Sequence, residues 1–207
     1  MQTEDGRLVI LSGKSRSGKT AYTVKAVAND KRIIAWDVED QWSQLRGWRR
    51  ITSAKDLLDA IDYHGNARIA FVPQGADLAK QFDFVAGCAL YWGRYHGACT
   101  FIAEELADVT TTAKAPGNWG LLLRRGLKRG ITIYAISQRW QEADKTAIGN
   151  ASEIVCFCMS TSLNIGYMAR NTRISVDRLN ALIPLEYLKF DVSTGEVTAG
   201  KLTFRKK

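Results

Sequence analysis

Residues 7–20 read RLVILSGKSRSGKT, an apolar run that passes directly into a segment rich in glycine and lysine. The apolar part, residues 7–12, is typical of a strand buried on both faces, and residues 19–29 carry apolar side chains at helical spacing. Between them stands GKSRSGKT at 13–20, which fits the P-loop (Walker A) pattern G-x-x-x-x-G-K-[S/T]. The motif therefore sits between a predicted strand and a predicted helix, as a phosphate-binding loop requires.

The chemistry of this loop predicts a nucleotide site. Gly13 lets the chain turn off the strand, and Gly18 lets backbone N–H groups approach phosphate oxygens at the start of a helix. We expect Lys19 to reach the β- and γ-phosphates and the Thr20 hydroxyl to ligate Mg²⁺. Arg16 replaces a glycine found in many P-loops and adds a cation. The predicted cofactors are ATP and Mg²⁺, and the predicted nucleotide-binding residues are Gly13, Lys14, Ser15, Arg16, Ser17, Gly18, Lys19 and Thr20.

The composition is that of a globular protein. The 207 residues include 29 Lys and Arg and 21 Asp and Glu, a net charge of +8, and 46% are hydrophobic, which argues against wholesale disorder. No run of about 18 apolar residues occurs, so we expect no membrane span. We expect a single domain over 1–207. The cysteines have apolar neighbours and no metal-binding spacing, which predicts reduced core residues at Cys88, Cys99, Cys156 and Cys158.

Apolar runs and amphipathic stretches alternate along the rest of the chain. They predict strands at 32–37, 68–72, 99–103, 131–137 and 153–159, and helices at 54–63, 77–96, 118–129, 162–170 and 175–182. Residues 107–118 are expected to form a flexible loop, and residues 186–204 a C-terminal hairpin turned at 193–196. Continuous apolar strands alternating with helices indicate an α/β P-loop NTPase fold, with a mainly parallel central sheet and helices on both faces.

Two adjacent acids follow the predicted strand 99–103. Glu104 and Glu105 would stand at its carboxyl end, where ligands bind in open α/β sheets. We expect Glu104 to reach Mg²⁺ through water, and Glu105 to orient or deprotonate the attacking water. Asp37 and Glu39 form a rival acidic pair at another strand end, but the polar residues after them favour a loop near the nucleotide.

Two further features lie around the predicted strand 131–137. If that strand neighbours 99–103, Gln138 lies at the same edge as Glu105, where its amide can contact the γ-phosphate and the lytic water. The basic run 124–129 ends a predicted helix, and cations there complement the helix dipole. Two adjacent arginines are more than is needed to complement the dipole of one helix. One of Arg124 and Arg125 is therefore a candidate arginine finger, which would reach the γ-phosphate held by a neighbouring subunit.

These segments together resemble a known superfamily. GKSRSGKT at 13–20, FIAEELADV at 101–109 and RRGLKRGITIYAISQR at 124–139 are similar to the corresponding motifs of the FtsK–HerA superfamily of DNA-pumping ATPases, which have a RecA/FtsK-like fold. The resemblance covers residues 7–170. In its small size and its lack of membrane helices or a DNA-reading domain, the chain is most similar to the genome-packaging ATPases of membrane-containing icosahedral viruses. These are the tectivirus-like and turreted archaeal virus group.

The resemblance implies a motor. Members of that group use a ring of subunits and ATP hydrolysis to drive double-stranded DNA into a preformed capsid. It implies a hexameric or pentameric ring, docking on a capsid vertex or on membrane-associated packaging proteins, and a location in the host cytoplasm or at the virion packaging vertex. The first acid of the pair is usually Asp in the family, so Glu104 is a departure with a longer arm. Carried over, the roles are Lys19 and Thr20 for phosphate and Mg²⁺, Glu104 for the Mg²⁺ site, Glu105 as catalytic acid, Gln138 as sensor, and Arg124, Arg125 or Arg129 as the trans finger.

The net positive charge is consistent with binding DNA without reading its sequence. Candidate contacts are the cluster Arg46–Arg50, the loop around Lys114, Trp119 and the tail Arg205–Lys207. The cluster Arg46–Arg50 is equally well interpreted as a solvated turn whose Trp48 packs on the protein body.

Two other functions fit a P-loop. One is a kinase that phosphorylates a nucleotide or another small molecule, with Asp37, Glu39 and the run 124–129 around its acceptor. The other is a non-translocating assembly factor that uses ATP only to hold a complex. The pair Glu104–Glu105 together with Gln138 favours the activation of water over the phosphorylation of a hydroxyl.

Overall fold

The computed structural model describes residues 5–63, 65–113, 115 and 117–204. Within them one sheet has the strand order β3-β4-β2-β5-β6-β1-β7-β8-β9. Neighbouring strands from β3 to β7 in this order are parallel, and β8 and β9 are antiparallel to their neighbours. The strands are β1 Leu8–Ser12, β2 Arg32–Trp36, β3 Arg49–Ile51, β4 Ala67–Phe71, β5 Thr100–Ala103, β6 Thr132–Ser137, β7 Glu153–Phe157, β8 Glu186–Asp191 and β9 Val197–Lys201.

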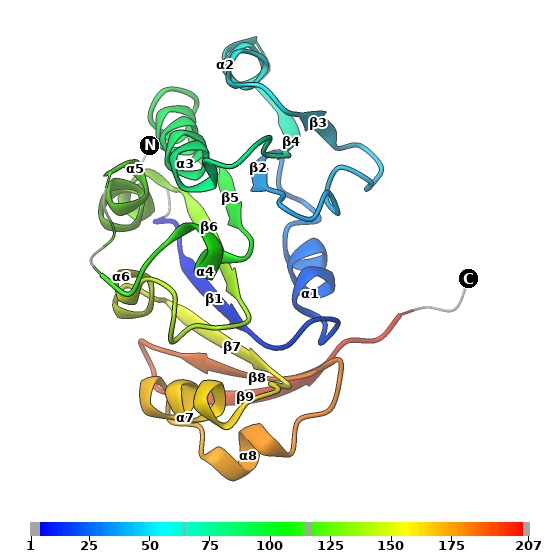
Figure 1. Cartoon of the computed structure of the whole chain (residues 1–207), viewed down its shortest axis with the longest axis vertical. Coiled ribbons are helices and arrows are strands. Elements are labelled where there is room, and N and C mark those ends of the chain that lie inside the picture. Colours follow the sequence, from blue (N-terminus) through cyan, green and yellow to red (C-terminus); the bar gives the residue numbers. More distant parts are fainter. Residues whose placement is uncertain (1–4, 64, 114, 116, 205–207) are drawn as a thin grey trace.

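Helices cover both faces of this sheet. Figure 1 shows α1 on one side and α3 and α5 on the other. The α-helices are α1 Lys19–Ala26, α2 Ala54–Tyr63, α3 Leu78–His96, α4 Leu106–Val109, α5 Gly117–Leu121, α6 Lys145–Gly149, α7 Ser162–Asn171 and α8 Val176–Asn180. The predicted mainly parallel α/β fold is confirmed.

The core divides into two apolar clusters, one on each face of the sheet. In β1, Leu8 and Ile10 belong to the cluster under α3 and α5, whereas Val9 and Leu11 belong to the cluster under α1. This alternation follows from the two-residue period of a strand, and it explains why a doubly covered strand reads as a continuous apolar run. All four cysteines are free and buried, as the sequence predicts.

The segment 117–129 differs from its prediction. The sequence predicts one helix over 118–129, but the chain forms α5, then a π-helical turn over Leu122–Gly126 and a 3₁₀ turn over Leu127–Arg129. Two glycines allow close packing here, because a Cβ on Gly120 would lie 2.2 Å from the Ala115 carbonyl oxygen and one on Gly126 would lie 2.9 Å from Leu122 Cδ1. Helical periodicity alone does not report such a change in winding.

Three short elements have no counterpart in the prediction: β3, α4 and α6. Of these, α4 (Leu106–Val109) runs into the start of the segment 107–118, which the sequence predicts to be a flexible loop. The predicted C-terminal hairpin is present as β8 and β9, joined by a turn at Gly195, which has φ 72°. Among the described residues, no helix has both the length and the hydropathy needed to cross a bilayer.

Candidate active site

The P-loop joins β1 to α1 in the geometry that its sequence predicts. Gly18 precedes α1 with φ 119°, a left-handed conformation that L side chains rarely adopt. A Cβ there would lie 3.0 Å from Leu202 Cδ1 and 3.1 Å from Phe157 Cε1. The loop is also tied to the end of β7, because the Lys14 N–H donates to the Cys158 carbonyl at 2.9 Å. Residues of β7 and of the C-terminal segment thus contact the P-loop and fix the position of its backbone.

Lys19 is held inside the loop. Its side chain is buried, and its Nζ donates to the carbonyl oxygens of Gly13 at 2.8 Å and Lys14 at 2.9 Å. Burial lowers the pKa of Lys19, while the nearby Glu105 and Glu104 oppose that shift. A phosphate with its negative charge is a better partner for this ammonium than two neutral carbonyls, so the lysine is poised to turn to a nucleotide.

Glu104 lies beside Thr20 at the carboxyl end of β5. The Thr20 hydroxyl donates to Glu104 Oε1 at 3.3 Å. Glu104 is only 5% exposed, and burial is the main cause that raises its pKa to about 7. A buried carboxylate next to a hydroxyl offers the oxygen ligands that Mg²⁺ prefers, and a bound cation would favour the charged form. Thr20 and Glu104 therefore fit the expected Mg²⁺ site.

No group of three or more His, Cys, Asp or Glu side chains among the described residues is arranged to hold a metal by itself.

Glu105 and Gln138 meet next to this site. The strands β5 and β6 are neighbours, with Ala103 opposite Ala135, and Gln138 Nε2 donates to Glu105 Oε1 at 2.8 Å. Glu105 has φ 46°, a left-handed conformation that is uncommon outside glycine and that often marks functional positions. Because β5 and β6 are neighbours, as the prediction for Gln138 required, Glu105 and Gln138 lie in contact.

Asn164, on α7, is a residue that the sequence did not single out. It is buried, and its Nδ2 donates to the Gln138 backbone carbonyl. The Thr161 hydroxyl accepts from the Asn164 N–H at 3.3 Å and caps the helix. Asn164 fixes the backbone of Gln138 from behind. Periodicity could not reveal this contact, because it joins two elements that are 26 residues apart.

These residues line one pocket of about 510 Å³. Five P-loop residues, both acids and Gln138 contribute to it, together with four residues that sequence reasoning did not include in the site and with Glu39 from the rival acidic pair. The lining residues are Ser15, Arg16, Gly18, Lys19, Thr20, Ala21, Glu39, Gln41, Glu104, Glu105, Ile136, Gln138 and Leu185. Gly13 and Ser17 are buried behind the loop, and Lys14 is exposed.

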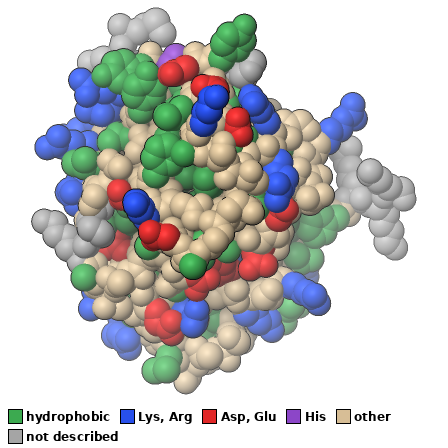
Figure 2. Space-filling model, turned by 45° about the horizontal axis from the view of Figure 1, so that its top comes forward, with side chains coloured by type: hydrophobic (Ala, Val, Ile, Leu, Met, Phe, Trp, Pro, Cys, Tyr) green, Lys and Arg blue, Asp and Glu red, His purple; other side chains and the backbone are tan. Residues whose placement is uncertain are grey.

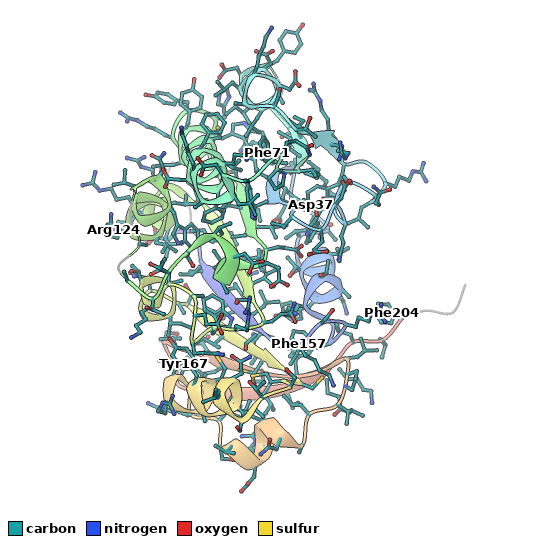
Figure 3. All side chains as sticks on the ribbon, in the orientation of Figure 1. Asp37, Phe71, Arg124, Phe157, Tyr167 and Phe204 are labelled. Atoms are coloured by element: carbon teal, nitrogen blue, oxygen red, sulfur yellow. The ribbon has the colours of Figure 1, made fainter. Side chains whose placement is uncertain are left out.

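Asp37 has a structural part in the wall of this pocket. It is fully buried and accepts hydrogen bonds from the backbone N–H of Gln41 at 2.8 Å and of Ser43 at 3.0 Å. Figure 3 shows Asp37 between β2 and the loop that follows it. This loop carries Glu39 and Gln41 to the pocket. The interpretation of the rival acids as part of a loop near the nucleotide agrees with this placement.

The basic run 124–129 does not lie at this pocket. Figure 3 shows Arg124 at the margin of the molecule away from α1 and the P-loop. Arg124 and Arg125 are exposed, and Arg129 is half-buried. Arg124 Nη1 donates to the Ala115 carbonyl at 3.5 Å, and in the described part of the chain none of the three arginines forms an ion pair. None of them lines the pocket of its own chain.

The residues predicted to contact DNA differ in how exposed they are. Trp119 is wrong as a DNA contact, because it is 2% exposed and its indole N–H donates to Asp144 Oδ2 at 3.0 Å. Trp48 packs against Trp42 with ring centroids 4.9 Å apart, and Arg50 pairs with Asp40 at 3.0 Å. Arg46 and Arg49 are exposed beside them. Lys114 and the tail Arg205–Lys207 lie outside the described residues.

Comparison with known proteins places this site in context. No family model matches the sequence. Protein P9 of Pseudoalteromonas phage PM2 is 29% identical over 203 residues, which are 95% of this chain and 90% of P9. The genome packaging NTPase B204 of Sulfolobus turreted icosahedral virus 2, in complex with AMPPCP, superposes with a TM-score of 0.78 at 16% identity, over 96% of this chain and 98% of B204.

This chain has the fold of a viral genome-packaging NTPase. The bacterial conjugative coupling protein TrwBdeltaN70 also superposes, with a TM-score of 0.64 at 9% identity over 98% of this chain and 86% of that protein. These superpositions confirm the P-loop NTPase fold that the motifs predict.

Proposed function

We propose that this protein is an ATPase that drives double-stranded DNA into a preformed viral capsid. The observation that carries the proposal is the meeting of Lys19, Glu105 and Gln138 in one pocket. A phosphate-binding lysine opposite a carboxylate that an amide holds in place is an arrangement for hydrolysis by an activated water. B204, which shares the fold, is described as a genome packaging NTPase and binds AMPPCP and ATP-gammaS.

Each residue of the pocket has a role in this proposal. When a nucleotide binds, Lys19 Nζ leaves the carbonyl oxygens of Gly13 and Lys14 and donates to the β- and γ-phosphates instead. The backbone N–H groups of the loop hold the remaining phosphate oxygens. Thr20 and Glu104 hold Mg²⁺, which when bound neutralises charge that develops on the phosphates. Glu105 accepts a proton from the attacking water. Gln138 orients the Glu105 carboxylate and contacts the γ-phosphate, and so distinguishes ATP from ADP.

The arginines act in a neighbouring subunit of a ring. Arg124 and Arg125 are exposed, form no ion pair in the described structure and lie away from their own pocket, so they are available to contact the nucleotide of another copy. Arg129 is the third candidate. A head-to-tail contact of this kind joins two different surfaces and closes into a ring, which we propose to be a hexamer or a pentamer.

A second cavity next to the pocket offers a surface for that contact. It measures about 650 Å³, adjoins Gln138, and includes the acids Glu39, Asp108 and Glu142 in its lining. Arg139 pairs there with Asp108 at 3.2 Å and with Glu142 at 3.0 Å. In Figure 2 a group of Asp and Glu side chains lies just below the middle of the face, while Lys and Arg side chains are spread over the face and its margins. Acids at the mouth of the site complement an arginine from a neighbour.

The partners follow from the same proposal. The net charge of +8 suits contact with the DNA backbone without sequence reading. The ring would dock on a capsid vertex or on membrane-associated packaging proteins, and would act in the host cytoplasm or at the packaging vertex of the virion.

The test is the rate of ATP hydrolysis with and without long double-stranded DNA, at low and at moderate salt. We expect DNA to stimulate hydrolysis, and salt to weaken the stimulation because it screens phosphate contacts. Lys19→Ala is the control, and it should remove both the basal and the stimulated rates. A rate that is indifferent to DNA at both salt concentrations, or transfer of phosphate to a small-molecule acceptor, would contradict the proposal.

A further inference from the structure

The chain returns to the P-loop after its last helix. The Leu185 N–H donates to the Ser17 carbonyl of the P-loop at 2.9 Å, and the Leu185 carbonyl accepts from the Leu202 N–H at 2.9 Å. Leu185 has φ 73°, a left-handed conformation that is unfavourable for a side chain of its size. The two hydrogen bonds hold this strained residue between the P-loop and the end of β9.

This arrangement places apolar side chains against the loop. A Cβ on Gly18 would lie 3.0 Å from Leu202 Cδ1 and 3.4 Å from Leu185 Cδ2, so both side chains border the loop backbone. Leu185 also lines the pocket of about 510 Å³, in which most of the lining residues are polar or charged. An apolar wall at one end of a phosphate site indicates a second, uncharged part of the ligand.

Phe204 extends this wall. It follows Leu202 by two residues and is 64% exposed. Figure 3 shows Phe204 on the same side of the molecule as the P-loop, near the start of α1. A large aromatic ring left in solvent two residues beyond Leu202, which borders the P-loop, is available to stack on a flat ligand.

The strand order sets the direction of the nucleotide. β1, which feeds the P-loop, has β6 on one side and β7, followed by β8 and β9, on the other. The residues for hydrolysis, Glu105 and Gln138, lie on the β6 side, where the γ-phosphate must be. A nucleotide that runs across the loop from that end therefore brings its base to the β7–β9 side, where Leu185 and Phe204 lie.

We propose that Leu185 and Phe204, supported by Leu202, form a platform on which the purine base of the nucleotide stacks. The proposal rests on the proposed function, because it needs a nucleotide in this pocket. Apolar and aromatic side chains contact the face of a base, while hydrogen bonds read its edge. The platform thus favours a nucleotide over its bare phosphate chain.

Isothermal titration calorimetry with two probes tests this. MgATP and inorganic triphosphate with Mg²⁺ share the phosphate chain, but only ATP has a base. We expect Phe204→Ala to weaken MgATP binding about 5- to 150-fold, the range for the loss of one aromatic stacking contact, and to leave triphosphate binding unchanged. Phe204→Trp should restore the affinity for MgATP. The control Tyr95→Ala removes an exposed aromatic residue of α3 and should change neither affinity.

Other results would overturn the platform. Unchanged MgATP binding by Phe204→Ala would show that the ring does not contact the base, and an equal loss for both probes would show that it acts on the phosphate site. If the unmodified protein binds neither probe, the nucleotide site itself is wrong, and the proposed function fails together with the platform.

Discussion

The nucleotide pocket and the arginine segment 122–129 make opposite use of charged side chains. In the pocket the charges face one another: Lys19 and Glu104 are 7% and 5% exposed, and Glu105 is hydrogen-bonded to Gln138. In the arginine segment, Arg124 and Arg125 point to solvent, and no described residue forms an ion pair with them. The pocket places opposite charges together within a single chain, whereas the arginines of the segment form no ion pair with any described residue. The difference supports the proposal that one chain holds the nucleotide and a second chain completes the site.

The most damaging change to the pocket is Lys19→Ala. It removes the ammonium that neutralises the β- and γ-phosphates and that now bonds to Gly13 and Lys14. We expect ATP turnover to fall at least about a thousand-fold, as for the loss of a main electrostatic contact to a transferring phosphoryl group. A coupled-enzyme or phosphate-release assay measures this. Normal turnover would remove the P-loop from the mechanism.

Glu105→Gln separates binding from chemistry within the pocket. The amide keeps the size of the side chain but cannot accept the proton of the attacking water. We expect turnover to fall about a hundred- to ten-thousand-fold, the range for the loss of a general base, while ATP affinity changes by less than about threefold. Single-turnover hydrolysis and equilibrium binding give the two numbers. An active variant would move the catalytic acid elsewhere.

Mixed rings test the arginine segment. We expect Arg124→Ala, Arg125→Ala or Arg129→Ala to reduce turnover about a hundred- to a thousandfold at the position that serves as the finger, as for the loss of one donor to developing charge. Mixing that variant with Lys19→Ala should restore part of the activity, because an intact P-loop then meets an intact arginine across the interface. The activity is measured over a series of mixing ratios. Failure of all three variants to be rescued would contradict a shared site.

The smallest expected effect is a change in stability on substitution of Glu104. Unlike the losses of activity above, it is a gain. Burial raises the pKa of Glu104 to about 7 from its usual 4.5, so folding loses free energy as pH rises through that window. Glu104→Gln removes the titration. We expect it to stabilise the nucleotide-free protein by up to about 3 kcal/mol at pH 8.5, and by little at pH 4.5.

Urea unfolding at the two pH values measures this difference. Glu142→Gln, at an exposed acid, is the matched control and should stay within about 0.5 kcal/mol of the unmodified protein. A Glu104→Gln variant that is less stable than the unmodified protein at pH 8.5 would show that the carboxylate stabilises the empty site.

The same comparison explains what could be predicted from the sequence. The P-loop follows from local spacing, because each of its constraints lies within about a dozen residues of one strand and one helix. The contact between Glu105 and Gln138 needed one further condition, that β5 and β6 be neighbours, and the sheet meets it.

The remaining features depend on packing between distant segments. The π-helical turn that carries Arg124 and Arg125 replaces a predicted regular helix. Asn164 and Leu185 reach the site from elements with no motif of their own. Neither periodicity nor composition encodes which surface a helix or a tail will meet, so these residues became visible only in the folded chain.

The central claim is that hydrolysis in this pocket moves double-stranded DNA. A duplex that carries a third strand bound in its major groove tests it directly, because a protein that translocates along the duplex displaces that strand. We predict displacement that requires ATP, is lost with Glu105→Gln, and takes longer as the distance to the third strand increases. ATP turnover on the same duplex without any displacement would contradict the claim.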